Sequence, residues 1–291
     1  MTPSHPRSAT PRAGSISPEL RWREITPPKR GIPQVDLREL WDYRDLALIL
    51  AKRELQLTYR QTLLGVAWVV LQPLLGTIIF SVVFGELAQL PSDGVPYAAF
   101  ALTGLTVWTF VSSAVSAAAD SLVEDRDLVT KVYFPRLLAP LAAVLAATVE
   151  LAITLVLLIP VLAITRVVPP IQVLTLPLWI VGAVLLAVAA GVWLAAGNVL
   201  YRDVRHMLGF LLQLWLFASP VAFSSSLVPD NWKWAYYLNP AAGLIDGMRW
   251  SVLGTPWPGP YLAISLASLL VLLASGIAWF NSAERAFADA I

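Results

Sequence analysis

The sequence predicts an all-α integral membrane protein with six transmembrane helices. Of its 291 residues, 57% are hydrophobic and 13% are charged, and the mean hydropathy is +0.69. These values lie outside the range of soluble domains. Apolar segments long enough to cross hydrocarbon about 30 Å thick give the number of helices, since each crossing takes roughly 20 residues. The expected spans are residues 63–86, 97–118, 137–164, 175–199, 207–226 and 261–281.

The first 60 residues differ in character from the rest of the chain. Residues 1–36 contain seven prolines and six Lys or Arg and no apolar core segment, so we expect a disordered cytosolic tail without a secretory signal. Residues 37–60 place most charged and amide side chains on one face of a helix. This pattern predicts a helix in the headgroup plane or a helix packed on another subunit. Residues 61–291 form the predicted six-span domain.

Lys and Arg are distributed unevenly between the two sides of the predicted membrane domain. Seventeen lie in the N-terminal region and in segments on its side, against Arg166, Lys233 and Arg249 on the other side. Because cytosolic segments of membrane proteins carry the excess of positive charge, both termini are expected in the cytosol.

Residues 120–136 form a charged island, DSLVEDRDLVTKVYFPR, between two apolar runs. Leu122, Val129 and Tyr133 fall on one face of a short helix, and Pro135 ends it because proline lacks an amide donor. A polar helix held between two spans can receive force from a soluble partner. A solvated loop is the alternative interpretation.

Glu150 lies near the middle of the third predicted span, where an ionised carboxylate facing lipid would cost several kcal/mol. It is therefore expected to face protein or water, or to stay protonated. Its role is either a hydrogen bond between helices or a proton relay. Four prolines inside predicted spans are each expected to loosen a helical turn, because each removes a backbone donor. They are Pro73, Pro140, Pro160 and Pro220.

Residues 227–260 lie between the fifth and sixth predicted spans and contain four of the twelve tryptophans and two adjacent tyrosines. Their helical portion is too short and too polar to cross the membrane, so we expect re-entrant helices that return to the outer face. Asp246 and Arg249 can form an ion pair at i, i+3. An aromatic belt at the membrane interface is the alternative explanation for the rings.

The sequence excludes several kinds of chemistry. With no cysteine and two histidines far apart, it offers no disulfide and no thiolate or histidine metal site. It has no phosphate loop, since no Gly-Lys pair occurs. We therefore expect no catalytic residue, cofactor or metal in this chain. A membrane glycosyl or acyl transferase is disfavoured by few, scattered outer acids, and a proton-driven transporter would depend on Glu150 alone.

Four segments resemble one known family. They are VPYAAFALTGLTVWTF together with LVTKVYFPRLLAPLAAV, YRQTLLGVAWVVLQPLLGTIIFSVVFG from Tyr59, YRDVRHMLGFLLQLWLFASPVAF from Tyr201, and LNPAAGLIDGMRW from Leu238. In this order, across residues 59–250, the chain resembles the membrane subunits of ABC-2 type polysaccharide exporters, which move O-antigen, teichoic acid and capsule chains. An exporter of a lipid or drug with the same fold is the nearest alternative.

The resemblance implies a homodimer in the bacterial inner membrane with two nucleotide-binding ATPase subunits, which bind ATP and Mg. The implied substrate is a polyprenyl-linked polysaccharide, and no nucleic acid is involved. Residues 120–136 would be the coupling helix that docks on the ATPase, residues 37–60 an interfacial gate helix, and residues 227–260 an extracytoplasmic gate.

Each implied element has its candidate residues. Those for coupling are Glu124, Asp125, Arg126, Lys131, Tyr133, Phe134 and Arg136. Those of the gate helix are Trp41, Arg44, Arg53 and Arg60. Aromatic faces and neutral hydrogen-bonding groups suit a sugar channel, and the candidates are Trp68, Gln72, Trp108, Phe110, Gln213 and Trp215. Those of the outer gate are Trp232, Trp234, Tyr236, Tyr237, Asp246 and Arg249.

Overall fold

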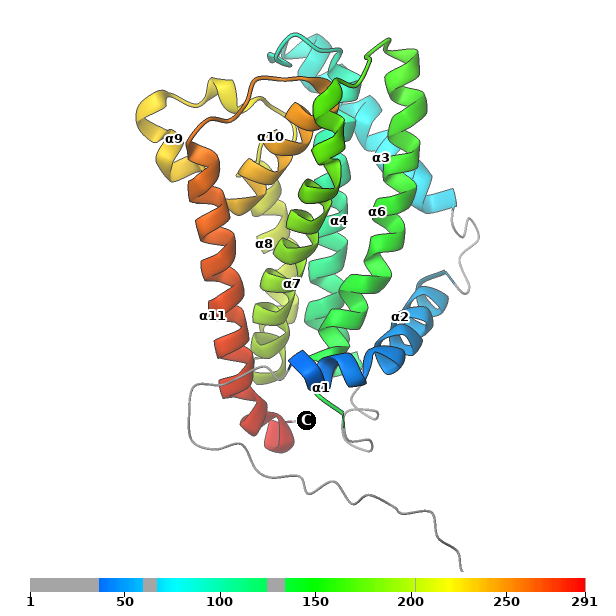
Figure 1. Cartoon of the computed structure of the whole chain (residues 1–291), viewed down its shortest axis with the longest axis vertical. Coiled ribbons are helices and arrows are strands. Elements are labelled where there is room, and N and C mark those ends of the chain that lie inside the picture. The colour runs from blue at the N-terminus through cyan, green and yellow to red at the C-terminus, as the bar shows by residue number, and fades with distance from the viewer. Residues whose placement is uncertain (1–36, 60–66, 125–133, 202, 291) are drawn as a thin grey trace, which may run out of the picture. The chain divides into compact units, whose positions relative to one another are not determined.

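The computed structural model describes residues 37–59, 67–124, 134–201 and 203–290, and every regular element in this part is a helix (Figure 1). The helices are α1 (Leu37–Asp42), α2 (Arg44–Tyr59), α3 (Ala67–Phe80), η1 (Ser81–Leu87), α4 (Tyr97–Glu124), α6 (Leu138–Ile164), η2 (Ile171–Thr175), α7 (Leu176–Leu200), α8 (Asp203–Phe217), η3 (Ser225–Leu227), α9 (Asp230–Tyr236), α10 (Pro240–Leu253) and α11 (Tyr261–Ala290).

Five helical segments in the described part are long and apolar enough to cross a membrane, so the chain is a multi-pass membrane protein. They match five of the six predicted spans. These segments are Ala67–Leu87, Tyr97–Glu124, Leu138–Ile164, Ile171–Leu200 and Tyr261–Glu284.

The predicted span 207–226 is wrong in its extent. The helix there, α8, begins at Asp203 and ends at Phe217, and Pro220 lies in the turn that follows it. Fifteen helical residues rise about 22 Å, which is less than the roughly 30 Å of a hydrocarbon core. Six full-length spanning helices are therefore not confirmed.

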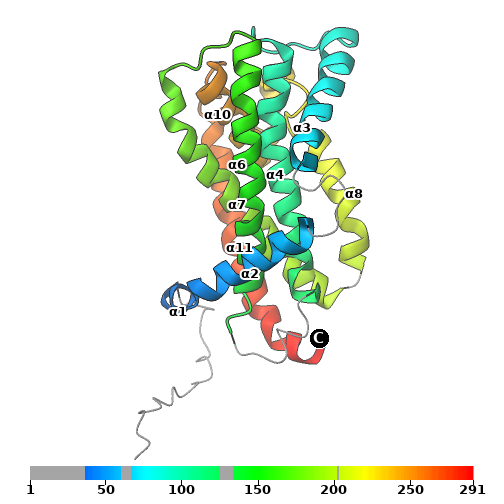
Figure 2. The ribbon, with the colours of Figure 1, turned by 90° about the vertical axis from the view of Figure 1, so that its right-hand side faces the viewer.

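The α4 helix occupies the centre of the described part. Helices α6 and α7 pack along it, and α3, α8 and α10 also contact it (Figure 2). A helix surrounded on several sides must be apolar around most of its circumference, and the buried side chains of α4 include Phe100, Phe110 and Val111. Small residues bring α7 close, since a Cβ added at Gly191 would lie 2.6 Å from the Cβ of Ala118.

Residues 203–222 run alongside α4 from one of its ends to the other. Near the last turn of α4, Arg205 Nε lies 3.4 Å from Asp120 Oδ1. At the first turn of α4, the Tyr97 hydroxyl donates a hydrogen bond to the carbonyl oxygen of Ala222. The chain therefore returns along the length of a 28-residue helix, although α8 itself has 15 residues. We call the end with Arg205 the α2 end and the opposite end the α10 end.

The predicted helix 37–60 is divided at Tyr43 into α1 and α2. On α2, Leu50 and Ala51 are buried in a core cluster that also contains Phe280 of α11. The side chains of Lys52 and Arg53 on the same helix are exposed. The described part of the helix thus turns Leu50 and Ala51 inward, while Leu48 and Ile49 are exposed together with charged side chains. Its position in the headgroup plane stays a prediction.

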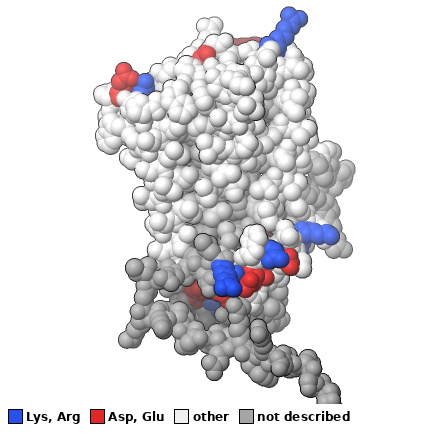
Figure 3. Space-filling view, viewed as in Figure 1, with Lys and Arg blue, Asp and Glu red and all other residues white. Residues whose placement is uncertain are grey.

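Charged side chains gather at the two ends of the face shown in Figure 3. The surface between the two groups is almost free of Lys, Arg, Asp and Glu. A band of this kind suits contact with hydrocarbon, because an exposed charge there would be costly.

The Glu150 side chain faces protein. Ser113 Oγ of α4 donates a hydrogen bond to Glu150 Oε2 of α6 at 2.9 Å, so the predicted hydrogen bond between helices is confirmed. Pro73 and Pro160 lie inside helices as expected. Pro140, however, lies in the first turn of α6, where a missing N–H removes no bond within the helix. The expected loosening at Pro140 is therefore wrong.

Candidate functional site: a polar cluster at the α10 end

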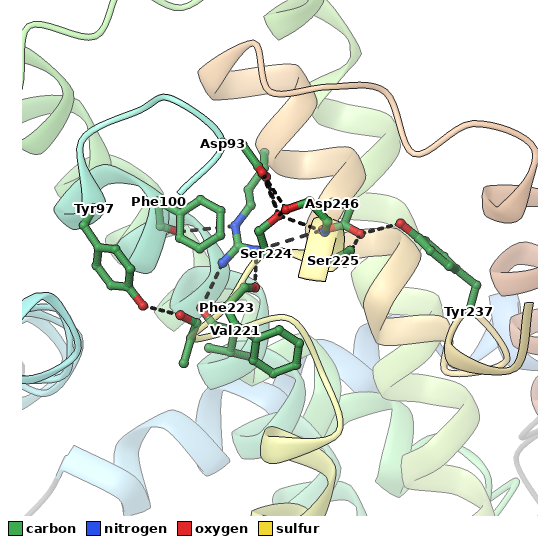
Figure 4. Close-up of polar contacts among 12 residues, drawn as sticks. Asp93, Tyr97, Phe100, Val221, Phe223, Ser224, Ser225, Tyr237 and Asp246 are labelled. Carbon is green, nitrogen blue, oxygen red and sulfur yellow. Dashed lines mark hydrogen bonds and ion pairs between the residues drawn. The ribbon is translucent and has the colours of Figure 1, made fainter. Parts of the chain in front are cut away.

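Arg249 of α10 is the centre of a buried polar cluster. Figure 4 labels its partners Phe100, Val221, Phe223 and Asp246. Its side chain is 1% exposed. The guanidinium donates to three carbonyl oxygens, those of Val221 at 2.8 Å, Phe100 at 3.3 Å and Phe223 at 3.4 Å. Its Cζ also lies 3.5 Å from the centroid of the Phe100 ring, which adds a cation–π contact. The guanidinium thus joins α10 to α4 and to the segment after α8.

Asp246 supplies the counter-charge from the same helix. Its Oδ1 lies 3.9 Å from Arg249 Nη1, so the predicted i, i+3 ion pair is confirmed. Ser225 Oγ and the Tyr237 hydroxyl donate to Asp246 Oδ2 at 2.5 and 2.8 Å. Burial raises the pKa of Asp246, and Arg249 opposes that shift. Burial lowers the pKa of Arg249 to about 10, so the guanidinium is still charged at neutral pH.

Asp93, between η1 and α4, connects a further segment to the cluster. Ser224 Oγ lies 2.7 Å from both carboxylate oxygens of Asp93, and Ser226 Oγ lies 3.1 Å from Oδ1. Residues 221–226 are therefore held by Asp93 on one side and by Asp246 and Arg249 on another. We call this segment the strap.

Sequence reasoning missed Asp93, Ser224 and Ser225. They are short polar residues in connections, and Asp93 is 131 positions away from Ser224. No spacing rule for helices or strands relates residues so far apart. Only the pairing of Asp246 with Arg249 could be read locally.

The candidate residues of the outer gate divide into two groups. Tyr237, Asp246 and Arg249 belong to the buried cluster, and Tyr236 packs edge-on against Tyr237, with ring centroids 5.7 Å apart. Burial and the neighbouring Asp246 raise the pKa of both tyrosines. On α9, by contrast, the exposed fractions of Trp232 and Trp234 are 61% and 56%. The cluster links α10 to α4 and to the segment after α8, while two large rings of α9 remain available for contact.

The candidate channel residues also divide into buried and exposed side chains. Trp108 and Phe110 lie in the core of the chain, 6% and 1% exposed, and cannot line a channel in this conformation. Trp68 and Gln72 of α3 and Gln213 of α8 are exposed.

Trp215 is half-buried and connects α8 to two neighbours. Its ring packs edge-on against that of Trp108, with centroids 5.7 Å apart. Its Nε1 donates to Asn239 Oδ1 at 2.8 Å. Asn239 is the N-cap of α10 and was not predicted as a site residue.

The candidate coupling residues lie only partly in the described part. Glu124 is the last residue of α4 and is exposed. Phe134 is 4% exposed and packs in the core cluster of α2, so it is not free to dock on a partner in this conformation. Arg136 Nη1 donates to the carbonyl oxygen of Glu284 at 2.8 Å. Outside the described residues lie Asp125, Arg126, Lys131 and Tyr133.

Among the candidates of the gate helix, Arg44 lies over the ring of Trp41, with Cζ 5.4 Å from the centroid. Both side chains are exposed, as is Arg53. Arg60 lies outside the described residues. The exposed ring and cations at the α2 end suit contact with headgroups or with another protein.

Known proteins match the part of the chain that contains α4, α8 and α10. The family model described as "ABC-2 type transporter" matches residues 46–253. An "O-antigen export system permease protein RfbA" from Myxococcus xanthus is 29% identical over 259 residues, which cover 88% of this chain and 98% of that protein. A protein of the same name from Klebsiella pneumoniae is 24% identical over 248 residues, covering 84% of this chain and 94% of that protein.

Proposed function

Since the chain belongs to the ABC-2 type transporter family, we propose that it is the channel-forming membrane subunit of an ATP-driven exporter. Its substrate is a lipid-linked polysaccharide, moved from the cytosol to the outer face of the bacterial inner membrane. The observation that carries this proposal is the likeness to O-antigen export permeases along most of both chains.

Energy comes from a separate polypeptide. The sequence has no phosphate-binding loop of the Walker type, so two ATPase subunits bind ATP and Mg and dock at the α2 end. The charged segment 120–136, with Glu124 exposed at the end of α4, is the docking element. In this orientation both chain termini lie in the cytosol and the α10 end lies outside.

The substrate path lies between two copies of the chain. Helices α3 and α8 leave apolar side chains exposed, among them Leu75 and Ile78 of α3 and Phe210 and Phe217 of α8. Faces of this kind are either covered by lipid or by a second subunit. A homodimer formed around them would bring Trp68, Gln72 and Gln213 of both copies to one pore, where neutral amides and aromatic faces suit a sugar chain.

Two elements control the ends of this path. At the cytosolic mouth, α1 and α2 are the gate helix in the headgroup plane. At the outer mouth, α9 and α10 form a re-entrant gate in which α10 is fixed by the Arg249 cluster and α9 presents Trp232 and Trp234. The segment from Asp203 to Ala222 is the fifth of six crossings.

Depletion of the chain tests this function. Cell-surface glycan is oxidised with periodate and labelled with a membrane-impermeant hydrazide, first on intact cells and then on lysed cells. Depletion should lower the label on intact cells and raise the lysate-only fraction several-fold, while re-expression restores both. Unchanged surface labelling after depletion would contradict glycan export, and accumulation of a phospholipid or drug in its place would favour the other ABC-2 substrates.

A further inference from the structure

The α8 helix has little packing to fix its position. Leu208 is its one buried residue between Asp203 and Phe217. The remaining large apolar side chains of α8 are exposed or half-buried. Side-chain packing determines where a helix rests in a membrane bundle, so contacts at the two ends of α8 have a large influence on its position.

The outer end of α8 is attached to the N-cap of the buried helix α10. Trp215 Nε1 donates to Asn239 Oδ1 at 2.8 Å, and Asn239 Nδ2 donates to Ser219 Oγ at 2.9 Å and to the Ala218 carbonyl at 3.0 Å. The following strap is held by Arg249. This end of α8 is therefore held by hydrogen bonds to the buried helix α10 and can serve as a pivot.

At the cytosolic end of α8, the Arg205 side chain joins the helix to α4. Arg205 Nε lies 3.4 Å from Asp120 Oδ1, and Arg205 Nη2 lies 3.4 Å from Glu124 Oε1. Asp120 is held in turn by the buried Asn198 of α7, whose Nδ2 lies 3.0 Å from Asp120 Oδ1 and 2.9 Å from the Ala119 carbonyl. Asp120 and Glu124 both belong to the predicted docking segment, residues 120–136.

We propose that Arg205 is a positioning residue that transmits movement of the docking segment to α8, through its paired contacts with Asp120 and Glu124. The inference rests on the proposed function and adds to it the link between the ATPase and the channel wall. A displacement of the last turn of α4 carries the two carboxylates with it, and the guanidinium follows them. Because the opposite end of α8 is a pivot, a shift at Arg205 tilts α8 and moves its exposed face, which carries Gln213.

The strength of the link suits a switch more than a structural support. Exposed ion pairs shift an equilibrium by roughly two- to five-fold, which is too little to hold the fold together. It is enough to bias a helix between two positions that differ little in energy. A planar guanidinium that contacts two carboxylates also fixes the orientation of α8 relative to α4. A lysine ammonium fixes this orientation less well, because it is a point charge on a flexible chain.

Substitution of Arg205 tests the link in the complex of the full chain with its ATPase subunit. Arg205→Gln should recover as much ATPase on pull-down as the wild type and hydrolyse ATP in proteoliposomes at a similar rate. Its surface glycan, labelled by periodate and hydrazide on intact cells, should fall about three- to five-fold. Arg205→Lys should retain roughly half of the export, and the neighbouring exposed His206→Gln should behave as wild type.

The cysteine-free sequence permits a rescue experiment. The double variant Glu124→Cys with Arg205→Cys lacks the ion pair and should export as poorly as Arg205→Gln. A short bifunctional maleimide, added to cells permeabilised to it, should restore export in the double variant and leave either single cysteine variant unchanged.

The outcomes separate the two proposals. Export by Arg205→Gln at the wild-type level, or a loss of export in step with lost ATPase recovery, would overturn the transmission role while leaving glycan export intact. Absence of glycan export by the wild-type complex would overturn the proposed function and this inference together.

Discussion

Arg249 is the residue at which a single substitution should have the largest electrostatic consequence. Its charge is buried, and its stability depends on Asp246, on three carbonyl oxygens and on the ring of Phe100. A buried charge that loses its counter-ion costs far more than an exposed one, because water cannot replace the missing partner.

We therefore predict that Asp246→Asn destabilises the protein by about 3 kcal/mol, the lower part of the range for breaking a buried pair. The amide keeps an oxygen for Ser225 and Tyr237 but removes the counter-charge that forms an ion pair with the guanidinium. Denaturant titration in micelles measures the loss. Asp230→Asn is the matched control, since it removes an exposed ion pair with Lys233 and should leave the unfolding midpoint unchanged. Equal midpoints for wild type and Asp246→Asn would contradict the role of the cluster.

Glu150 supports a second prediction at this scale. Because Ser113 Oγ donates to its carboxylate, Glu150→Gln keeps an acceptor for that hydrogen bond and removes the titratable proton. The variant should retain most export, as measured by hydrazide labelling of intact cells, whereas Glu150→Leu should lower thermal stability. Loss of export by Glu150→Gln at normal membrane levels would instead favour proton coupling.

The partner of a polar side chain could be predicted from the sequence only where it is nearby in the chain. The pair Asp246 and Arg249 follows from helical spacing, but Asp93 and Ser224 meet across 131 positions. Phe134 shows the opposite difficulty. Its place in a polar segment suggested exposure, yet its ring completes a core cluster with Leu50 and Phe280. Which face of a short segment is covered depends on the tertiary fold.

Among the elements, α10 is the most tightly enclosed of the short helices that the structure describes. Its glycines allow neighbours to approach closely. A Cβ added at Gly247 would lie 2.1 Å from the Trp179 ring, and one at Gly243 would lie 2.5 Å from Ser265 Cβ. Trp179 cannot move aside freely, since its Nε1 donates to Thr175 Oγ1 at 3.2 Å.

Gly247→Ala should therefore cost about 1–3 kcal/mol, the usual penalty for overpacking a core. Gly209→Ala on α8 is the control, because nothing lies within 4 Å of its added Cβ. The control should be unchanged or more stable by about 0.5–1 kcal/mol, since alanine favours a helix. Thermal melting of both variants in detergent distinguishes them, and similar melting temperatures would mean that α10 adjusts its position readily.

The end of α8 was not predictable from its composition. Residues 207–226 read as one apolar run, but the helix stops at Phe217. The turn after Phe217 is compatible with an apolar environment because protein groups satisfy its polar atoms. Ser219 Oγ donates to the Trp215 carbonyl and accepts from Asn239. Asn239 comes from another element, and the hydropathy of residues 207–226 does not reveal it.

At the scale of the whole chain, the class of fold and five spanning helices followed from the sequence, because a membrane span depends on local hydropathy. The number of crossings is a separate matter. If the segment from Asp203 to Ala222 crosses, the two flanks of α8 lie on opposite sides and α11 returns the chain to the side on which it began. If it does not cross, both flanks of α8 share one side and the end of α11 lies opposite.

Cysteine labelling decides between these arrangements, and the cysteine-free sequence needs no background removal. Single cysteines at four exposed positions, His206, Trp232, Val168 and Ser282, report the flanks of α8, the loop before α7 and the end of α11. With six crossings, Trp232→Cys and Val168→Cys should react with an impermeant maleimide in spheroplasts. His206→Cys and Ser282→Cys should react only after permeabilisation. We expect a crossing because residues 203–222 extend along the whole length of α4, whose 28 residues rise about 42 Å. Labelling of His206→Cys and Trp232→Cys from the same side would contradict a crossing by α8 and, with it, a shared side for the two termini.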